Sequence, residues 1–381
     1  MFACPPSLSP SGLVAYAAIT YILWGVTYTM MDIPYWSMIP AFTKSGKERE
    51  GLTTLARSCA GVGSALVTIF TVMIVNAIGK AIAGADASAT QVEIAGFKWF
   101  AAIVAVLFIV FITITCINIK EKATVDMKSP SIGEMFKALI SNDQAMTIVI
   151  AIVLINSSVY ITSNLVIYFF KYDFGGEGWK GSYTLFNMFG GAVQILSMMI
   201  MYPLLRKVAS NVKIFYICLA SAIIGYGVLF AITFTSMSNV MLLFIPGFFI
   251  FSANGVLQVL TTVFLANTVD YGHLKNGRRD ESVIFSMQTF VVKLASGIAA
   301  LIASICLSIN NLKSETGDEV DQAYDFAKDV AQSSKLGLRM TMTIIPIIGL
   351  FVAVAIFKKK FILTDEKMKE IGEEIKVKYS E

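Results

Sequence analysis

Residues 282–307 read SVIFSMQTFVVKLASGIAALIASICL, an apolar run that is interrupted by a single charge, Lys293. A run of about 18 or more apolar residues is long enough to cross a bilayer as a helix. Residues 13–41, LVAYAAITYILWGVTYTMMDIPYWSMIPA, form a second such run, in which Asp32 is the only charge. Charges inside membrane helices are rare and mark the pathways of ions and substrates. The two runs therefore indicate a membrane protein, and the two opposite charges favour a transporter.

The composition of the whole chain supports the same fold class. Of the 381 residues, 56% are hydrophobic and 15% are charged, and the mean hydropathy is +0.70. A soluble domain carries about 25% charged residues. We therefore expect an all-α membrane protein with about nine transmembrane helices. The predicted spans are residues 13–41, 56–82, 96–118, 145–170, 182–205, 212–235, 240–268, 282–309 and 338–358.

Signals for other classes of protein are weak. The net charge of +4 is small and spread over short loops, which argues against a nucleic-acid partner. The sequence has no HExxH and no GxSxG, and neither of its Gly-Lys pairs, at Gly46 and Gly79, continues as a P-loop. A single histidine and the lack of CxxC give no basis for a metal or haem cofactor. We expect no enzyme and no cofactor, so uphill transport would draw on an ion gradient.

The distribution of Lys and Arg predicts the orientation in the membrane. If the first helix runs inward, 21 of the 30 basic residues lie in inner segments and eight in outer ones. Cytoplasmic loops are enriched in Lys and Arg. We therefore expect an external N-terminus and a cytoplasmic C-terminus in a multi-pass plasma-membrane protein. The charged tail after Phe361 is expected to be solvated.

Asp32 and Lys293 are expected at similar depth. Both lie roughly 14–16 Å from the inner ends of their helices, near the midplane of the bilayer. An unpaired charge there is strongly unfavourable, so the two should approach each other or share a polar cavity. A static ion pair that only fixes helix packing is the alternative.

Residues near Asp32 on its own helix could complete a binding site. Tyr28 and Thr29 precede it by about one turn and can face the same side. A carboxylate with hydroxyl oxygens suits a hard cation such as Na⁺, which makes Asp32 and Thr29 candidate ligands and Tyr28 a candidate substrate contact. Trp36, one turn beyond, is either an interfacial anchor or a stacking platform for a sugar ring.

Polar side chains elsewhere leave two interpretations open. Thr289 shares a face with Lys293, and Gln288 does so less well, while Asn156 lies in the fourth predicted span. Such groups can bond sugar hydroxyls, but they also hold membrane helices together.

Four stretches carry a resemblance to a known family. They are residues 21–37 (YILWGVTYTMMDIPYWS), 47–52 (KEREGL, leading to Arg57), 267–272 (NTVDYG) and 281–293 (ESVIFSMQTFVVK). In order along the chain, they resemble the melibiose permease group, the glycoside–pentoside–hexuronide:cation symporters of the major facilitator superfamily. The resemblance implies that a sugar or glycoside moves with a monovalent cation, Na⁺ or H⁺, by alternating access in a bacterial inner membrane.

The resemblance also implies roles for individual residues. Asp32 resembles an aspartate that serves sugar and cation binding, Thr29 a cation-site hydroxyl, and Lys293 a lysine beside the cation carboxylates. The residues that resemble sugar-site or nearby polar positions are Trp36, Arg57, Asn156, Gln288 and Thr289. Tyr160 stands where melibiose permease has a second asparagine, and this departure bears on which sugar is bound.

The family pattern has twelve helices, whereas this sequence matches from just before the fourth. We therefore expect an incomplete bundle that lacks one three-helix inverted repeat and whose sugar:cation symport is impaired. A non-transporting membrane sugar sensor or an inactive transporter remnant is the alternative. The expected divisions are residues 1–118 (the remaining three helices of the N-terminal half), 119–144 (a cytoplasmic linker), 145–361 (the six-helix C-terminal half) and 362–381 (a cytoplasmic tail).

Overall fold

The long helices lie close to the predicted spans. The computed structural model describes residues 8–43, 46–84, 87–119, 133, 137, 140–176, 178–235, 239–277, 280–312 and 326–379, and in these it contains no β-strand. Its long helices are α1 (Pro10–Phe42), α2 (Lys47–Ala83), α3 (Ala89–Asn118), α5 (Asp143–Phe169), α6 (Trp179–Leu196), α8 (Asn211–Ile232), α9 (Met241–Asn276), α10 (Glu281–Ile309) and α11 (Gln332–Lys360). Shorter elements are the π-helices η1 (Phe170–Phe174) and η2 (Ser197–Met201), α7 (Tyr202–Val208), the 3₁₀ helix η3 (Phe326–Asp329) and α12 (Asp365–Tyr379). Most of the predicted linker 119–144 lies outside the described residues.

Within the described residues, eight helices are long and apolar enough to cross a membrane. The second predicted span, 56–82, is not among these eight. It falls within α2, whose end at Met73–Ala83 is a shorter apolar stretch. The most apolar window of α9 is 72% buried by protein, whereas those of α1 and α3 are 0% buried. Exposed apolar surface on that scale marks a contact with a membrane or with another protein, and the length and composition of these helices fit a membrane. The prediction of an all-α membrane protein with about nine spans is therefore confirmed.

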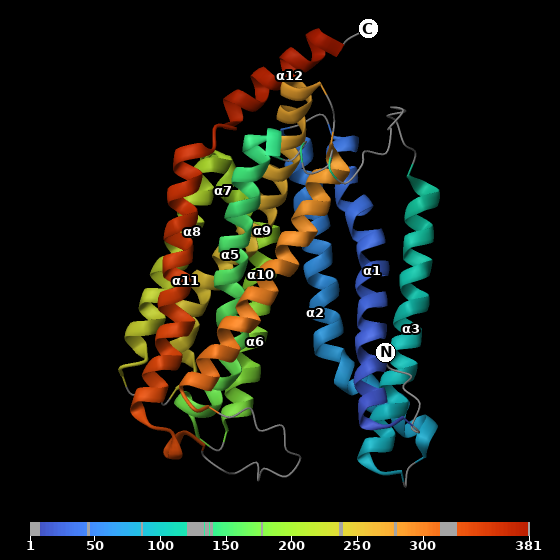
Figure 1. Cartoon of the computed structure of the whole chain (residues 1–381), viewed down its shortest axis with the longest axis vertical. Coiled ribbons are helices and arrows are strands. Elements are labelled where there is room, and N and C mark those ends of the chain that lie inside the picture. Colours follow the sequence, from blue (N-terminus) through green and yellow to red (C-terminus); the bar gives the residue numbers. More distant parts are fainter. Residues whose placement is uncertain are drawn as a thin grey trace. The chain divides into compact units, whose positions relative to one another are not determined.

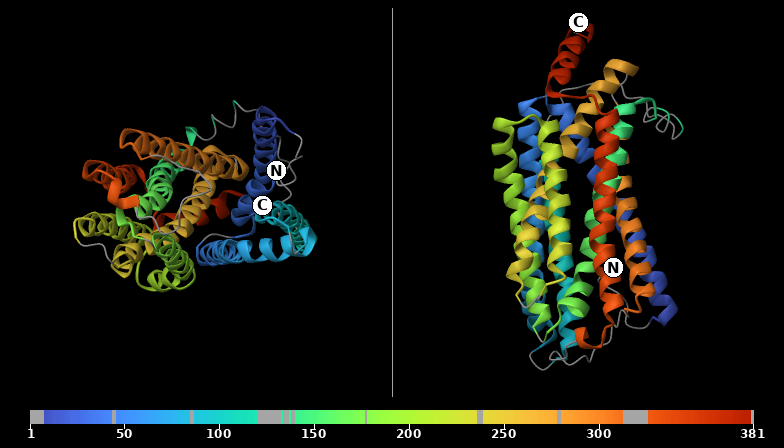
Figure 2. Two further views of the ribbon diagram at one scale, coloured as in Figure 1. Left: turned by 90° about the horizontal axis from the view of Figure 1, so that it is seen from below. Right: turned by 90° about the vertical axis from the view of Figure 1, so that its left-hand side faces the viewer.

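The chain forms two compact units. Unit 1 comprises Met1–Phe42 and Cys59–Lys128, and unit 2 comprises Thr43–Ser58 and Ser129–Glu381. Helix α2 thus begins in unit 2 and ends in unit 1. The long helices of unit 2 run side by side along its length (Figures 1 and 2).

Two central helices organise unit 2. Helix α5 packs against α10 and α11, α9 packs against α6 and α8, and α5 and α9 also contact each other. Helix α9 has the largest number of buried residues among these helices, from Leu243 to Gly272. It can lie at the centre because apolar residues occur on all its sides over most of its length, and several of its buried polar residues, such as Thr262 and Asp270, are bonded to other helices.

In unit 1, α2 and α3 approach closely through two glycines. A Cβ atom at Gly79 would overlap the backbone carbonyl of Val92, and one at Gly96 would overlap that of Val75. Both valines are buried, with 7% of the surface of Val92 and 2% of that of Val75 exposed. Small residues allow membrane helices to pack backbone to backbone, where dispersion contacts replace the hydrophobic effect.

Replacing Gly79 or Gly96 with Ala is expected to destabilise the protein by about 1–3 kcal/mol, because the added methyl group forces the two helices apart. Thermal unfolding of the purified protein in detergent measures this as a lower midpoint. The matched control is Gly63→Ala, also in α2, where an added Cβ meets nothing within 4 Å. Equal midpoints for all three variants would contradict the close approach of the helices.

Candidate functional site

The predicted residues of α1 form one local cluster around Asp32. The indole Nε1 of Trp36 donates a hydrogen bond to Oδ1 of Asp32 at 3.0 Å, and the Tyr28 hydroxyl donates to the same oxygen at 3.3 Å. The three residues are spaced by four along the helix, which places them on one face. Trp24 extends the aromatic surface, since its ring stacks on Tyr28 at 5.6 Å. Tyr28 thus faces the same side as Asp32, as the sequence suggested, and Trp36 does so too. The binding roles of these residues stay predictions.

Thr29 lies beside this cluster, and its hydroxyl proton is already engaged in a hydrogen bond. Its hydroxyl donates to the backbone carbonyl of Gly25 at 2.7 Å. That bond leaves the lone pairs of the hydroxyl oxygen, which are the part a cation would use. Pro34 continues the helix without a backbone N–H, so the carbonyl of Met30 loses its helical donor. Carbonyl, hydroxyl and carboxylate oxygens therefore occur within little more than one turn.

Arg57 is positioned by α9. Its Nε and Nη2 atoms donate to Thr262 Oγ1 at 3.0 and 2.7 Å. A second contact joins the same two helices: Arg49 of α2 pairs with Asp270 of α9. From the first contact to the second, the residue number falls by eight in α2 and rises by eight in α9. The start of α2 therefore runs antiparallel to α9. Tyr160 of α5, the departure noted in the sequence, lies within electrostatic range of Arg57.

The other predicted residues of unit 2 lie on α5 and α10. Asn156 is half-buried on α5, and Gln288 is buried on α10 with 8% of its surface exposed. Neither side chain makes a hydrogen bond to a described residue. The Thr289 hydroxyl donates to the Phe285 carbonyl at 3.3 Å. Lys293 follows one turn later and is exposed. Asp32 and Lys293 belong to different units, so their approach stays a prediction.

Two charged networks hold Thr43 and the start of α2 against the rest of unit 2, and sequence reasoning assigned these networks no role. Arg49, 1% exposed, lies 2.9 Å from Asp270 and donates to Asn267 Oδ1 at 3.0 Å and to Thr43 Oγ1 at 3.2 Å. The sequence did contain a hint of this ion pair, because the segments KEREGL and NTVDYG both carry charges next to apolar spans. Their pairing spans more than 200 residues, which single-sequence patterns do not reveal.

The second network contains Glu50 and the chain's last helix. Glu50 accepts bonds from Arg206 Nε at 2.8 Å and from Asn211 Nδ2 at 2.7 Å, and Arg206 also pairs with Asp365 at 2.8 Å. Burial raises the pKa of Asp365, although Arg206 opposes that shift.

The tail is only partly solvated, contrary to the sequence expectation. Leu363, Met368 and Ile371 are buried against a cluster that includes Tyr271 and Leu274 of α9. The periodicity of these few apolar residues is obscured by the charges between them. Helix α12 is therefore attached to unit 2 by one apolar side and by Asp365.

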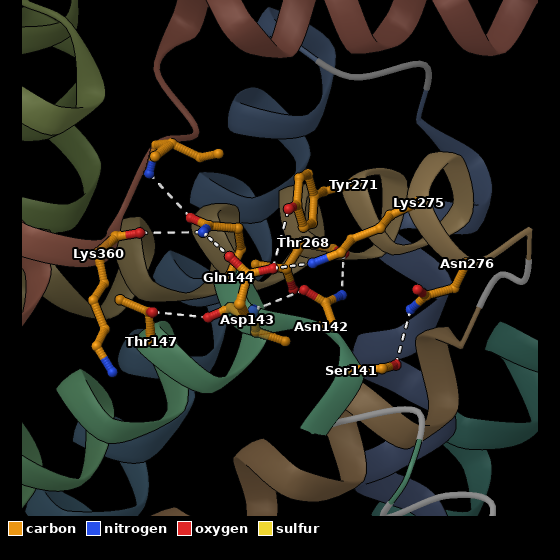
Figure 3. Close-up of polar contacts among 12 residues, drawn as sticks. Ser141, Asn142, Asp143, Gln144, Thr147, Thr268, Tyr271, Lys275, Asn276 and Lys360 are labelled. Carbon is orange, nitrogen blue, oxygen red and sulfur yellow. Dashed lines mark hydrogen bonds and ion pairs between the residues drawn. The ribbon is translucent and has the colours of Figure 1, made fainter.

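Three consecutive side chains attach the start of α5 to its neighbours (Figure 3). Asn142 donates to the carbonyl of Thr268 at 2.8 Å, and Asp143 accepts from Tyr271 at 3.0 Å and pairs with Lys275 at 2.5 Å. Gln144 bonds the Lys360 carbonyl and the Ile362 N–H, at 3.1 and 3.0 Å. The start of α5 thus meets the end of α9 and the turn from α11 to α12, which shows that α5 and α9 are antiparallel.

A helical membrane bundle with a carboxylate and aromatic donors on an apolar helix is the architecture of a membrane transporter. Residues 1–362 match a family described as MFS/sugar transport protein, and the chain belongs to this family. It is therefore a member of a transporter family and not an enzyme.

Several curated proteins are similar to this chain. The lactose permease of Lactobacillus delbrueckii subsp. bulgaricus is 26% identical over 95% of this chain and 55% of its own length. The raffinose carrier protein of Pediococcus pentosaceus is 26% identical over 94% and 53%, and the inner membrane symporter YicJ of Escherichia coli is 24% identical over 97% and 74%. The chain spans about half the length of the lactose permease and the raffinose carrier.

Proposed function

We propose that this chain binds a sugar or glycoside and a monovalent cation, Na⁺ or H⁺, and serves their symport across the plasma membrane by alternating access. The observation that carries the proposal is the convergence of Tyr28 and Trp36 on the Asp32 carboxylate within an apolar helix. Membership of a sugar-transport family and similarity to proteins named as permeases and symporters support it.

Asp32 has two tasks in this proposal. Its carboxylate accepts hydrogen bonds from sugar hydroxyls, and its charge offsets that of the cation. The indole of Trp36 offers a flat apolar face to a sugar ring while its N–H orients Asp32. For Na⁺, the Thr29 hydroxyl and the Met30 carbonyl would add oxygen ligands. For H⁺, Asp32 would be the group that is protonated.

The remaining proposed contacts belong to unit 2. Arg57, Asn156, Gln288 and Thr289 supply donors and acceptors for sugar hydroxyls. Lys293 competes electrostatically with the coupling cation, so that cation binding and the lysine charge are linked. Asp32 and Lys293 should therefore approach each other, or share one polar cavity, when the units come together.

We place the end of unit 2 that carries α12 in the cytoplasm, because basic residues concentrate there. Residues 1–118 and 145–361 would then be parts of the two halves that rock against each other, with 119–144 as the linker and 362–381 as the tail. The ion pairs of Arg49 and Glu50 join the first half to the second at this end. Their rupture would accompany opening toward the cytoplasm.

The direct test uses the purified chain in liposomes with an imposed Na⁺ or H⁺ gradient. Accumulation of labelled disaccharide above its external concentration, abolished by an ionophore that collapses the gradient, would support coupled symport. The impaired symport expected from the sequence would give weaker accumulation. Uptake that only equilibrates, with or without the gradient, would contradict coupling. Absence of both uptake and sugar binding would contradict the proposed function.

A further inference from the structure

A small cavity lies inside unit 2, between α5, α6, α8, α9 and α11. Its volume is about 50 Å³. Most of the wall is apolar and includes Phe170, Phe186, Phe251 and Leu243. None of the described residues that line it is charged. Ser163 and Asn187 line the cavity from exposed positions, so they mark its mouth.

Asn254 is the unusual member of this lining. Its surface is 9% exposed, and among the described residues its side chain has no hydrogen-bond partner. The other polar side chains there are bonded: Thr162 donates to Met342, Ser163 to Val159 and Asn187 to Tyr183, at 2.8–3.0 Å. Asn254 therefore supplies an unused donor and acceptor to an apolar cavity.

The cavity lies along two helices that also carry or contact proposed sugar residues, although none of those residues lines it. On α5, Ser163 lies three residues after Tyr160 and seven after Asn156, which places all three on one face. On α9, Asn254 lies eight residues before Thr262, the partner of Arg57, or about 12 Å along the helix. Because α5 and α9 are antiparallel, moving from Tyr160 to Ser163 on α5 and from Thr262 to Asn254 on α9 leads toward the same end of the bundle. The cavity is thus about one disaccharide length beyond Arg57.

The size and chemistry of the cavity select a small group. A cavity that holds benzene measures about 150 Å³, so one of about 50 Å³ admits only a few heavy atoms. We propose that it is a subsite for the exocyclic hydroxymethyl group of a neutral hexose residue, with the methylene among the apolar side chains and the hydroxyl bonded to Asn254. This inference rests on the proposed sugar transport and narrows its substrate class.

The subsite would distinguish neutral hexosides from pentosides and hexuronides, the three substrate classes that the family resemblance allows. A pentose residue has no hydroxymethyl group and would leave Asn254 without a partner. A hexuronate residue would place a carboxylate in an apolar cavity that offers no cation, which is strongly unfavourable. The preferred substrates are therefore glycosides with a neutral hexose at the distal position.

The test compares disaccharides that differ only in hydroxymethyl groups. Isomaltose and isoprimeverose form one matched pair, and cellobiose and xylobiose form another. Binding to the purified full chain is measured by calorimetry. We expect the hexose member of at least one pair to bind about 10-fold or more tightly than its pentose counterpart. Asn254→Leu keeps a side chain branched at Cγ but removes the hydrogen bonds and fills part of the cavity, and should largely abolish this preference while pentose binding is retained.

Two further variants guard against a folding defect. Ser163→Trp, at the exposed mouth, should block the cavity and also remove the preference. Asn276→Ala, an exposed asparagine at the far end of α9, is the matched control and should retain it. Thermal unfolding checks that each variant folds.

The outcomes separate the subsite from the function. Equal binding within both pairs by the wild type, or a preference that survives both Asn254→Leu and Ser163→Trp, would overturn the subsite and leave sugar binding intact. Equal loss of hexose and pentose binding in Asn254→Leu would also overturn it. A wild type that binds no sugar from a wider panel of neutral, pentose and uronide glycosides would overturn the proposed function and the subsite together.

Discussion

Asp32→Asn is expected to abolish gradient-driven sugar accumulation. The amide can still take part in hydrogen bonds to sugar hydroxyls, but it carries no charge to offset a cation and no proton to release. A hydrogen bond to a charged group contributes roughly 1.5–3 kcal/mol, so its loss should weaken sugar binding by about 10- to 100-fold. Loss of coupling is more severe, because accumulation then falls to the equilibrium level whatever the gradient. Labelled-sugar uptake by vesicles containing the protein measures both effects.

Two matched variants show whether the charge itself is responsible. Asp143→Asn makes the same chemical change at a carboxylate that is half exposed and paired with Lys275, and should leave accumulation unchanged. Trp36→Phe removes the indole N–H that orients Asp32 but keeps the charge, so it should weaken sugar binding while some coupling remains. Normal accumulation by Asp32→Asn at wild-type expression would exclude Asp32 from the mechanism.

The sequence predicted the helices of this protein well for a simple physical reason. A membrane helix must be apolar over nearly its whole length, since no water is present to satisfy other conformations. The end of α10 at Ile309 was predicted to the residue, and α1 extends only a few residues beyond its predicted span. The start of α2 was less predictable. Its first turns from Lys47 are charged, and they are helical because Arg49 and Glu50 find partners in α9, α7 and α8.

The candidate site could be predicted only where it depends on local spacing. Tyr28, Asp32 and Trp36 follow from the helical repeat, because residues four apart share a face. The contact of Arg57 with Thr262 and the unpartnered Asn254 depend on how α2, α5 and α9 pack. An asparagine in an apolar helix has the same sequence signal whether it bonds a neighbouring helix or lines a cavity. Tertiary structure distinguishes these cases, and a single sequence does not.

The largest effect on stability is expected at the buried pair of Arg49 and Asp270. Replacing either partner leaves the other charge buried and uncompensated, since their side chains are 1% and 10% exposed. Breaking such a pair costs about 3–5 kcal/mol. We therefore expect Arg49→Met and Asp270→Leu each to lower the free energy of unfolding by that amount, measured by denaturant unfolding in detergent.

The double variant makes this prediction specific to the ion pair. With both charges removed, neither is left without a partner, so the combined loss should be smaller than the sum of the single losses by about 2 kcal/mol or more. Lys275→Met is the matched control. It breaks the pair with Asp143, whose side chains are 43% and 53% exposed, and should cost at most about 1 kcal/mol. Two results would show that the Arg49–Asp270 pair does not hold the start of α2 to α9. One is a double variant whose loss of unfolding free energy equals the sum of the single losses. The other is single losses no larger than that of Lys275→Met. The proposal that its rupture accompanies opening of this end of the protein would then lose its energetic basis.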